Sequence, residues 1–278
     1  VATTQIASGN LALVAATPAA AASGRVVVYG ADLAGRVLPA FRSASGAPMP
    51  LASHLGMSRR MEWSPVNGST SVNSYGGGAG SAGTPTSHIV SAGSFFNWCR
   101  RLSFVSTGTP GTSGEIFGNR LTHGLGDVAG GGGFSFFGTF AIADAAAVAD
   151  ARMFVGFTGT ALATTNAEPS SRANIIGVGC DAGETTLSII HNDASGTATK
   201  VGLGASFPAN TQSTDVYMLV LYAQPQATEV VYLVRRLNTG DEASGVLTTD
   251  LPSGATTLSP HFWRNNGTTA LAVDLAFM

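Results

Sequence analysis

The sequence predicts an all-β protein: an antiparallel, jelly-roll-like β-sandwich with an extended, Gly/Ala-rich N-terminal region. Roughly ten short apolar runs follow residue 94, separated by turn signals, as in sandwich domains. The run DVYMLVLY (215–222) is apolar on both alternating faces, which predicts a central strand with neither face in water. No internal repeat of about 20–50 residues is found, which argues against a solenoid or a propeller.

Composition predicts an oligomer. Only 11% of the 278 residues are charged, the net charge is -2 and the mean hydropathy is +0.23, whereas about 25% of residues are charged in ordinary domains. Few charges keep copies apart, so association is favoured. The alternative is a membrane protein, but the longest weakly polar run (11–22) contains Pro18 and is shorter than the roughly 20 residues of a spanning helix. It also lacks the cationic segment of a signal peptide.

The basic residues argue against nucleic-acid binding. Thirteen of the 14 are arginines, Lys200 is the single lysine, and they are scattered singly or in pairs without a basic stripe. Arginine in place of lysine suits buried interfaces, because guanidinium is less strongly hydrated and pairs in a planar geometry. We therefore expect no nucleic-acid partner and no membrane insertion.

Few helices or strands are predicted in the first third of the chain. Residues 1–24 read as an attachment arm, 25–30 as a short strand and 35–41 as a second strand that Pro39 keeps at an edge. Residues 45–56 form a Pro-broken loop. The Gly/Ser-rich segment 64–93 is a flexible loop or a strand-free crossing held by other subunits. We place a domain boundary near residue 92, giving an attachment and oligomerisation region (1–92) and a sandwich domain (93–278).

The sandwich domain begins with an alternating apolar stretch at 95–106 that predicts a strand. Within 133–140 the residues Phe134, Phe136, Gly138 and Phe140 share one face. Residues 141–151 form either a short helix capped by Asp144 or a loop. Further strands are predicted through 151–222, 228–237 and 258–266. A C-terminal strand follows a hairpin turn at Asn266–Gly267.

The two cysteines, Cys99 and Cys180, lie in apolar runs and form no CxxC motif. Reduced, buried thiols in a chain that folds in a reducing cytoplasm are the expected state. A disulfide between them is the alternative.

No motif for catalysis, a cofactor or a metal emerges, so we predict a protein that is not an enzyme, with no catalytic, cofactor-binding or metal-binding residues. The Gly-rich runs 76–83 and 130–133 lack the GK[ST] of a phosphate loop. His191, Asn192 and Asp193 read as a hairpin turn rather than a site. Two carboxylates at a fixed separation would suit a glycosidase. The candidates for such a pair are Asp150, Glu168, Asp181, Glu184 and Asp215.

Aromatic side chains that could stack on a sugar are Trp63, Tyr75, Trp98, Phe262 and Trp263. Trp98 and Trp263 lie in strand-like runs, where packing in the core is the common fate of an aromatic ring. Trp63 and Tyr75, which flank the Gly/Ser-rich segment, are the better candidates for sugar contact.

Several packing and turn strings carry a family resemblance. They are GRVLPAF (35–41), RRMEWSP (59–65), RRLSF (100–104), ARMFVGFTG (151–159), NAEPS (166–170), NIIGVGCDAGETTL (174–187), IIHNDASGTATKVGLGASFPANT (189–211), DVYMLVLYAQP (215–225) and VRRLNTG (234–240). With them the chain resembles tailed-bacteriophage and prophage virion proteins of the tail-fibre or tail-appendage kind. The resemblance spans nearly the whole chain.

This resemblance implies a virion structural protein, a homotrimer assembled in the host cytoplasm and located in the virion. Its partners would be further copies of itself, other tail or baseplate proteins through the N-terminal region, and a host surface glycan or protein. A capsid decoration, collar or head-fibre component without host contact is the alternative. A carbohydrate-degrading tail enzyme is a third reading.

Overall fold

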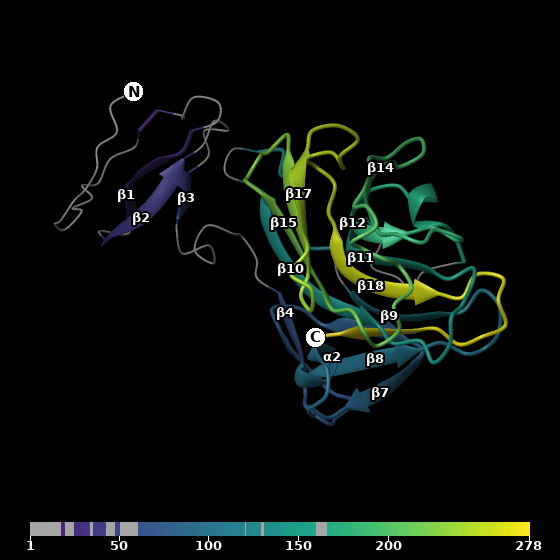
Figure 1. The fold of residues 1–278 in the computed structure, drawn as a ribbon. Coiled ribbons are helices and arrows are strands. Elements are labelled where there is room, and N and C mark those ends of the chain that lie inside the picture. The colour runs from purple at the N-terminus through teal and green to yellow at the C-terminus, as the bar shows by residue number, and fades with distance from the viewer. Residues whose placement is uncertain are drawn as a thin grey trace. The chain divides into compact units, whose positions relative to one another are not determined.

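A computed structural model gives the fold, which is drawn in Figure 1. It describes residues 18–19, 25–33, 36–42, 48–50, 61–119, 121–128, 131–159 and 166–278. The chain divides into two compact units, Val1–Ser58 and Arg59–Met278. No helix in these described ranges is long and apolar enough to cross a membrane.

The first unit contains a three-stranded antiparallel sheet in the order β1-β2-β3. Its strands are β1 (Val27–Leu33), β2 (Arg36–Arg42) and β3 (Pro48–Pro50). The first two strands confirm the predicted pair, whereas β3 lies in a stretch expected to be a loop. β2 is therefore central and not an edge strand. Among the described residues β3 pairs only with residues 40–42, so Pro39 has no strand partner on that side there. The arm predicted at 1–24 lies almost wholly outside the described residues.

The second unit is a sandwich of two seven-stranded antiparallel sheets, which confirms the predicted fold class. The β10 sheet contains, in order, β17 (Glu242–Leu247), β16 (Val230–Arg236), β15 (Tyr217–Ala223), β10 (Phe134–Ile142), β19 (Asp274–Phe277), β8 (Arg101–Val105) and β7 (Thr84–His88). The β11 sheet contains, in order, β14 (Thr199–Gly202), β13 (Ser188–Asn192), β12 (Ile175–Cys180), β11 (Arg152–Thr158), β18 (Ser259–Asn265), β9 (Ser113–Gly118) and β6 (Ala79–Ala82).

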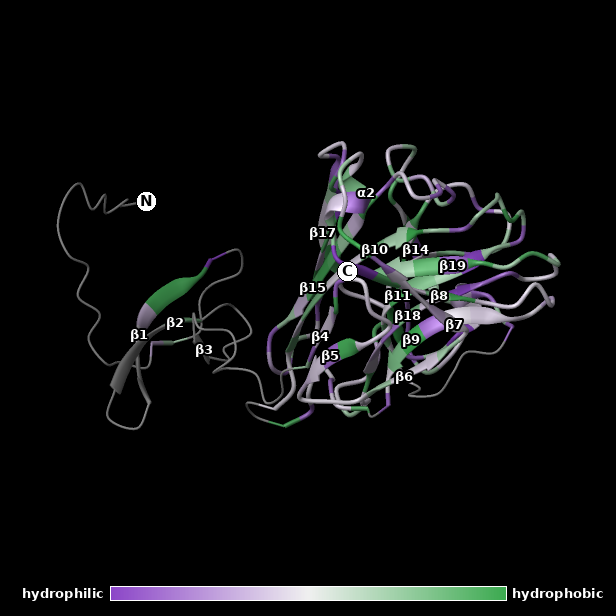
Figure 2. Ribbon diagram, turned by 90° about the horizontal axis from the view of Figure 1, so that it is seen from below, coloured by the Kyte–Doolittle hydropathy of each residue, from purple (hydrophilic) through white to green (hydrophobic). Residues whose placement is uncertain are grey.

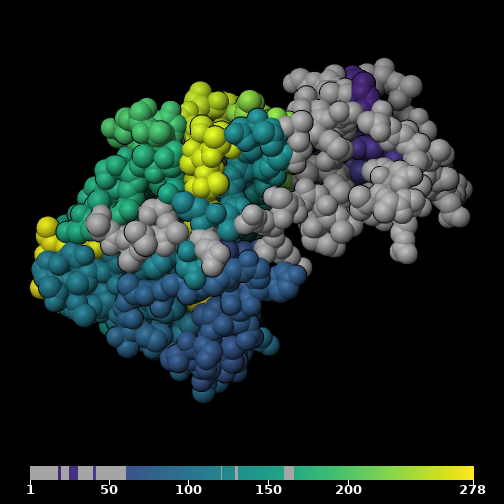
Figure 3. Space-filling view, turned by 180° about the vertical axis from the view of Figure 1, so that it is seen from behind, coloured from purple at the N-terminus to yellow at the C-terminus, as the bar shows by residue number. Residues whose placement is uncertain are grey.

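Three small elements complete the unit: the hairpin of β4 (Glu62–Pro65) and β5 (Val72–Tyr75), the single turn α2 (Phe95–Trp98) and the 3-10 turn η1 (Pro169–Ser171). The chain crosses repeatedly between the sheets, so strands that are distant in sequence become neighbours. β18, for example, lies between β11 and β9. Figure 3 shows the result at the surface, where yellow C-terminal atoms adjoin green and teal atoms from earlier segments.

The core fills the space between the sheets, where hydrophobic residues recur along the strands (Figure 2). Phe134, Phe136 and Phe140 of β10 point inward, as their two-residue spacing predicts. The rings of Phe134 and Phe136 meet Phe157 of β11 edge-on, with centroids 4.8 and 5.2 Å apart. Such aromatic pairs contribute about 0.5–1.5 kcal/mol each beyond the apolar area they bury.

A buried ion pair links the sheets at one end of this core. Arg264 of β18 donates through Nε to both carboxylate oxygens of Asp144, at 3.0 and 2.9 Å, and Nη2 donates to Asn210 Oδ1 at 2.8 Å. Both charged side chains are fully buried. Residues 141–151 are accordingly a strand end followed by a loop, so the helical alternative is wrong. Asp144 binds the arginine instead of capping a helix.

Three further expectations are corrected. Segment 64–93 is not strand-free, because it contains β5, β6 and β7, and each of the last two is an edge strand of one of the two large sheets. Residues 95–98 form α2, whose Ser94 N-cap accepts from the Asn97 N–H, so the strand starts only at Arg101. Asn266–Gly267 is a turn but not a hairpin, since it connects β18 to β19 in the other sheet. The different roles predicted for 1–92 and 93–278 stay predictions.

Both cysteines are free. Cys180 is buried in β12, and burial raises the pKa of its thiol to about 11. Cys99 follows α2 and is only partly buried, contrary to expectation. The disulfide alternative is therefore wrong.

Candidate functional site

The β4–β5 hairpin combines an exposed aromatic ring with a cavity behind it. Its register pairs Glu62 with Tyr75 and Trp63 with Ser74. Alternation along β4 directs Trp63 to the side that packs on the sandwich core, while Tyr75 is 67% exposed. The two aromatic residues singled out for sugar contact thus belong to one hairpin but have different surroundings.

A cavity of about 90 Å³ lies against Trp63. It is lined by Met61, Trp63, His123, Ser135, Phe136, Phe137, Gly138, Phe157, Pro260, Phe262, Phe277 and Met278. The pairing of β10 explains why space exists here. β10 pairs with β15 from Phe134 to Phe140, but with β19 only from Phe140 to Ile142. The first half of β10 therefore has no β19 neighbour, and the cavity adjoins this half.

The cavity offers polar groups as well as rings. The indole Nε1–H of Trp63 is buried and has no hydrogen-bond partner among the described residues. A buried donor without an acceptor costs roughly 1–3 kcal/mol. His123 Nδ1 lies 2.9 Å from Thr122 Oγ1. A volume of about 90 Å³ accommodates roughly three water-sized groups.

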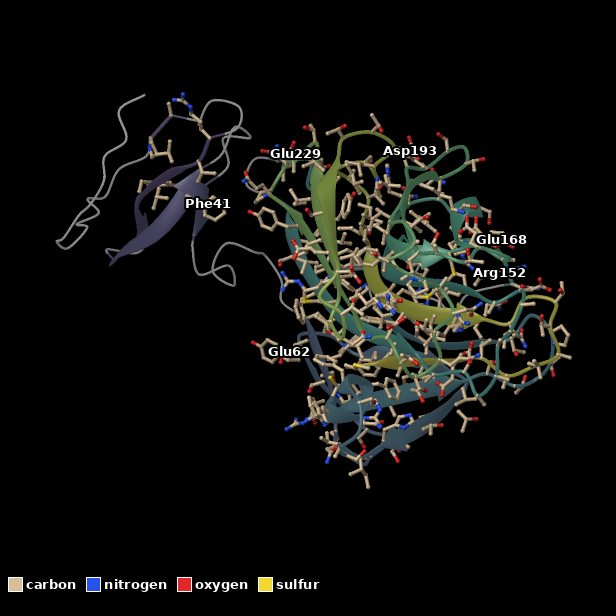
Figure 4. All side chains as sticks on the ribbon, viewed as in Figure 1. Phe41, Glu62, Arg152, Glu168, Asp193 and Glu229 are labelled. Atoms are coloured by element: carbon tan, nitrogen blue, oxygen red, sulfur yellow. The ribbon has the colours of Figure 1, made fainter. Side chains whose placement is uncertain are left out.

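The outward side of the hairpin forms an open hollow of about 270 Å³, lined by Glu62, Ser64, Asn73, Ser74 and Tyr75. Glu62 lies at the margin of the sandwich unit in Figure 4. An exposed ring beside a carboxylate, an amide and hydroxyls can hold the apolar face of a sugar and bind its hydroxyl groups.

The histidines do not assemble into a site. His54 lies outside the described residues, and His123 lines the cavity. His191 and Asn192 are the last two residues of β13, and His191 Nδ1 lies 3.1 Å from the main-chain oxygen of Asp250, so the predicted turn is wrong for these two residues. The turn begins at Asp193, which accepts from the Ser195 N–H at 2.7 Å. The remaining two, His88 and His261, make separate side-chain contacts with Ser103 and Glu115.

Three of the five candidate carboxylates belong to one network. Lys200 Nζ lies 2.7 Å from Asp181 Oδ2 and 2.6 Å from Glu184 Oε1. Glu168 accepts from the Ala182 N–H at 2.9 Å and pairs with Arg152, which lies beside it in Figure 4. The other two carboxylates lie elsewhere: Asp215 binds Arg236, and Asp150 accepts from Thr268.

This network does not suit glycosidase chemistry, which needs one carboxyl group kept protonated. Burial by itself would raise the pKa of Asp181, but hydrogen bonds from Lys200 and Ser170 outweigh it, and the pKa is lowered. Lysine and arginine thus occupy the oxygens that would take part in the reaction. Within the described part of the chain, no cluster of His, Cys, Asp or Glu could hold a metal ion.

The large aromatic residues divide differently from expectation. Trp263 is fully buried and Phe262 is in the core. Trp98 is 65% exposed, because α2 replaces the predicted strand and directs this side chain to solvent. Sequence reasoning missed Phe137, which is 69% exposed. Its exposure was predictable, because Phe137 shares a face of the strand with Ser135 and Thr139.

No protein-family model matches the chain, and no curated protein matches it. Solved structures that it resembles include peanut lectin with a 9mer peptide, at 12% identity over 72% of this chain and 90% of that chain, with a TM-score of 0.45. Lectin UEA-II complexed with galactose gives 14% identity over 72% and 92% of the two chains and a TM-score of 0.45. A legume lectin-like domain from Entamoeba histolytica is 9% identical over 72% of this chain and 88% of that chain, with a TM-score of 0.45. The similarity is low, and the fold assignment rests on the strand pairing itself.

Proposed function

We propose that the chain is a structural protein of a bacteriophage virion, a homotrimeric tail appendage that contacts a host surface glycan through the β4–β5 hairpin. The observation that carries the glycan contact is the exposed Tyr75 ring beside Glu62 and Asn73 on the outward side of the hairpin. The virion assignment rests on the sequence resemblance and on the low charge of the chain.

The chemistry of the hairpin fits a neutral, hydroxyl-rich ligand. The face of a sugar ring is apolar, so it packs on Tyr75 and removes water from both surfaces. Its hydroxyl groups bond the carboxylate and amide at the hollow.

The glycan contact is tested by binding of labelled protein to host cells and to polysaccharide extracted from them. We expect Tyr75→Ala to weaken binding at least tenfold, because loss of a stacked ring costs more than about 1.4 kcal/mol. Trp98→Ala is the matched control, since Trp98 is an aromatic of similar exposure outside the hairpin. Equal binding by wild type and Tyr75→Ala would refute the hairpin as the contact.

The virion assignment is tested separately by immunogold electron microscopy of purified particles. Label on a tail appendage supports the proposal. Label on the capsid or collar, without binding to host cells, would support the decoration or collar alternative instead. Release of sugar from host polysaccharide by the pure protein would support the enzymatic alternative.

A further inference from the structure

The outward side of the β10 sheet carries a group of apolar and aromatic side chains across four strands, with polar residues among them. Cross-strand pairing arranges the outward residues in three rows: Ser135–Tyr222–Val231–Val246, Phe137–Val220–Leu233–Ser244 and Thr139–Met218–Arg235–Glu242. We name these twelve residues the apolar face. Their neighbours along each strand point into the sandwich core.

The apolar face is open to solvent at three of its apolar positions, whereas Met218, Val220, Tyr222 and Leu233 are partly buried. Phe137 is 69% exposed, Val246 53% and Val231 40%. Val231 and Val246 are direct cross-strand partners, so their exposed surfaces adjoin. The solvent side of an antiparallel sheet ordinarily carries polar residues in alternation with the core. A contiguous apolar surface instead marks a place where something binds.

At the opposite end of the β10 sheet, the outward side is covered by another segment of the same chain, the turn α2. Phe96 of α2 is 5% exposed and packs with Ala141, Val216 and Ala276. The described residues provide no equivalent cover for Phe137, Val231 and Val246, which keep 40% or more of their surface exposed. The open half is therefore a distinct surface and not an extension of the core.

Charge indicates which partner fits. The apolar face has two charged members, Arg235 and Glu242, and they pair with each other, with Arg235 Nε donating to Glu242 Oε2 at 3.0 Å. The face is thus electrically neutral, so an identical face meets no like-charge repulsion. A strongly charged partner would find no complementary field on this face.

We propose that the apolar face is the surface through which copies of this chain associate, each of the three copies directing this face toward their common axis. This rests on the self-association in the proposed function, but not on its glycan contact. Four strands about 4.8 Å apart and roughly 20 Å long span about 400 Å². That is about half of the roughly 800 Å² that each partner buries in a standard interface, so the face forms the central part of the contact and not all of it. Arg235, Glu242 and Ser244 form a polar border of the face on one side.

Sedimentation velocity of the full chain at micromolar concentration tests the proposal. We expect wild type to sediment as an oligomer, and Val246→Lys and Val231→Lys to shift it to monomer, because each places a repeated like charge in the contact. Leu271→Lys is the matched control, since Leu271 is 45% exposed and lies outside the apolar face. Circular dichroism and thermal melting check that each variant is folded.

The outcomes separate this inference from the proposed function. If wild type is an oligomer and both lysine variants keep its mass, the apolar face is not the interface, and a different surface holds the trimer. If wild type is a monomer, the self-association of the proposed function fails with it, whereas host binding by Tyr75 is unaffected. If the lysine variants do not fold, Val246→Thr decides: roughly tenfold weaker association supports the face, and unchanged association overturns it.

Discussion

The outward sides of the two sheets differ sharply. On the β11 sheet the outward side chains are buried: Trp263 and Ile190 are 0% exposed and Phe154 is 1%. The Arg172 guanidinium lies over the Trp263 ring, 5.4 Å from its centroid, so the chain that follows β11 folds back over this side. On the β10 sheet the corresponding side is open and apolar. One sheet is therefore covered by its own chain, and the other has a surface available to a partner.

Close packing on the covered side extends to the backbone. Gly177 of β12 lies beneath the Phe154 ring, and a Cβ at this position would be 2.6 Å from Phe154 Cζ and 2.3 Å from the Val155 carbonyl oxygen. Only glycine allows this approach. The same side also holds the buried pair of Glu115 and His261, whose Oε2 and Nε2 atoms are 2.8 Å apart. The covered side is thus a second, partly polar core.

The largest effect should come from breaking that second core. Trp263→Ala removes a fully buried indole from the outward side of the β11 sheet, and we expect it to lower the free energy of unfolding by about 3–5 kcal/mol. Phe137→Ala on the open side is the comparison, with an expected loss below about 1 kcal/mol. Urea unfolding of both variants measures the difference. Similar losses would mean that the two outward sides are equally structural.

Asp274 provides a pH-dependent test at the covered end of the β10 sheet. Burial raises the pKa of its carboxyl to about 7, with a smaller contribution from Asp144 and an opposing hydrogen bond from Ser103. Between about pH 4 and 7 the folded state holds a proton that the unfolded state has lost. Stability therefore falls as pH rises through this window, by about 2–4 kcal/mol in total.

Asp274→Asn removes this titration and should unfold at higher urea concentration than wild type at pH 8, with little difference at pH 4. The measurement is urea unfolding at four pH values between 4 and 8. The physical reason is that Asn keeps an acceptor for Ser103 without a buried charge. Parallel pH profiles for the two proteins would show that Asp274 is ordinarily ionised.

His261 gives a smaller effect with the opposite sign. Burial lowers its pKa, although Glu115 raises it in part, so the imidazole is neutral in the fold. The unfolded chain takes up a proton below about pH 6.5, and the stability contributed by His261 is lost as pH falls through that value. We expect His261→Ala to lower the free energy of unfolding by about 1–3 kcal/mol at pH 8, because it removes a buried partner of Glu115. The variant should also lose less stability than wild type as pH falls below about 6.5. If urea unfolding at pH 5 shows the same loss of stability in the variant as in wild type, His261 is not the source of that loss.

The sequence predicted the sandwich because the inward residues follow a two-residue period, as in Phe134, Phe136 and Phe140. It failed where both alternating positions are apolar. In β15 this pattern predicted two buried faces, but Met218, Val220 and Tyr222 are only partly buried, so the apolar excess marks the open side instead. In β11 the same kind of pattern does reflect two buried faces. Local sequence cannot distinguish the two cases, because the cover comes from distant segments.

The candidate site was predictable in part. Trp63 and Tyr75 were identified because they flank a segment poor in bulky residues, and they do belong to one hairpin. The cavity was not predictable, since it depends on where β19 stops pairing with β10. Asp144 was misread for a similar reason. Its partner Arg264 is 120 residues away in the chain, and the residues near Asp144 in sequence do not predict that contact.

The smallest expected effect tests the open side. Val246→Thr replaces one methyl group by a hydroxyl at a half-exposed position, and we expect it to change the free energy of unfolding by less than about 0.5 kcal/mol in dilute protein, where copies are apart. At high protein concentration wild type should gain stability, because association favours the folded state, and the variant should gain less. Urea unfolding at two protein concentrations separated by a hundredfold measures both quantities. Equal gains for the two proteins would mean that Val246 faces solvent in the assembly, and the contrast between the two sheets would then reflect folding alone.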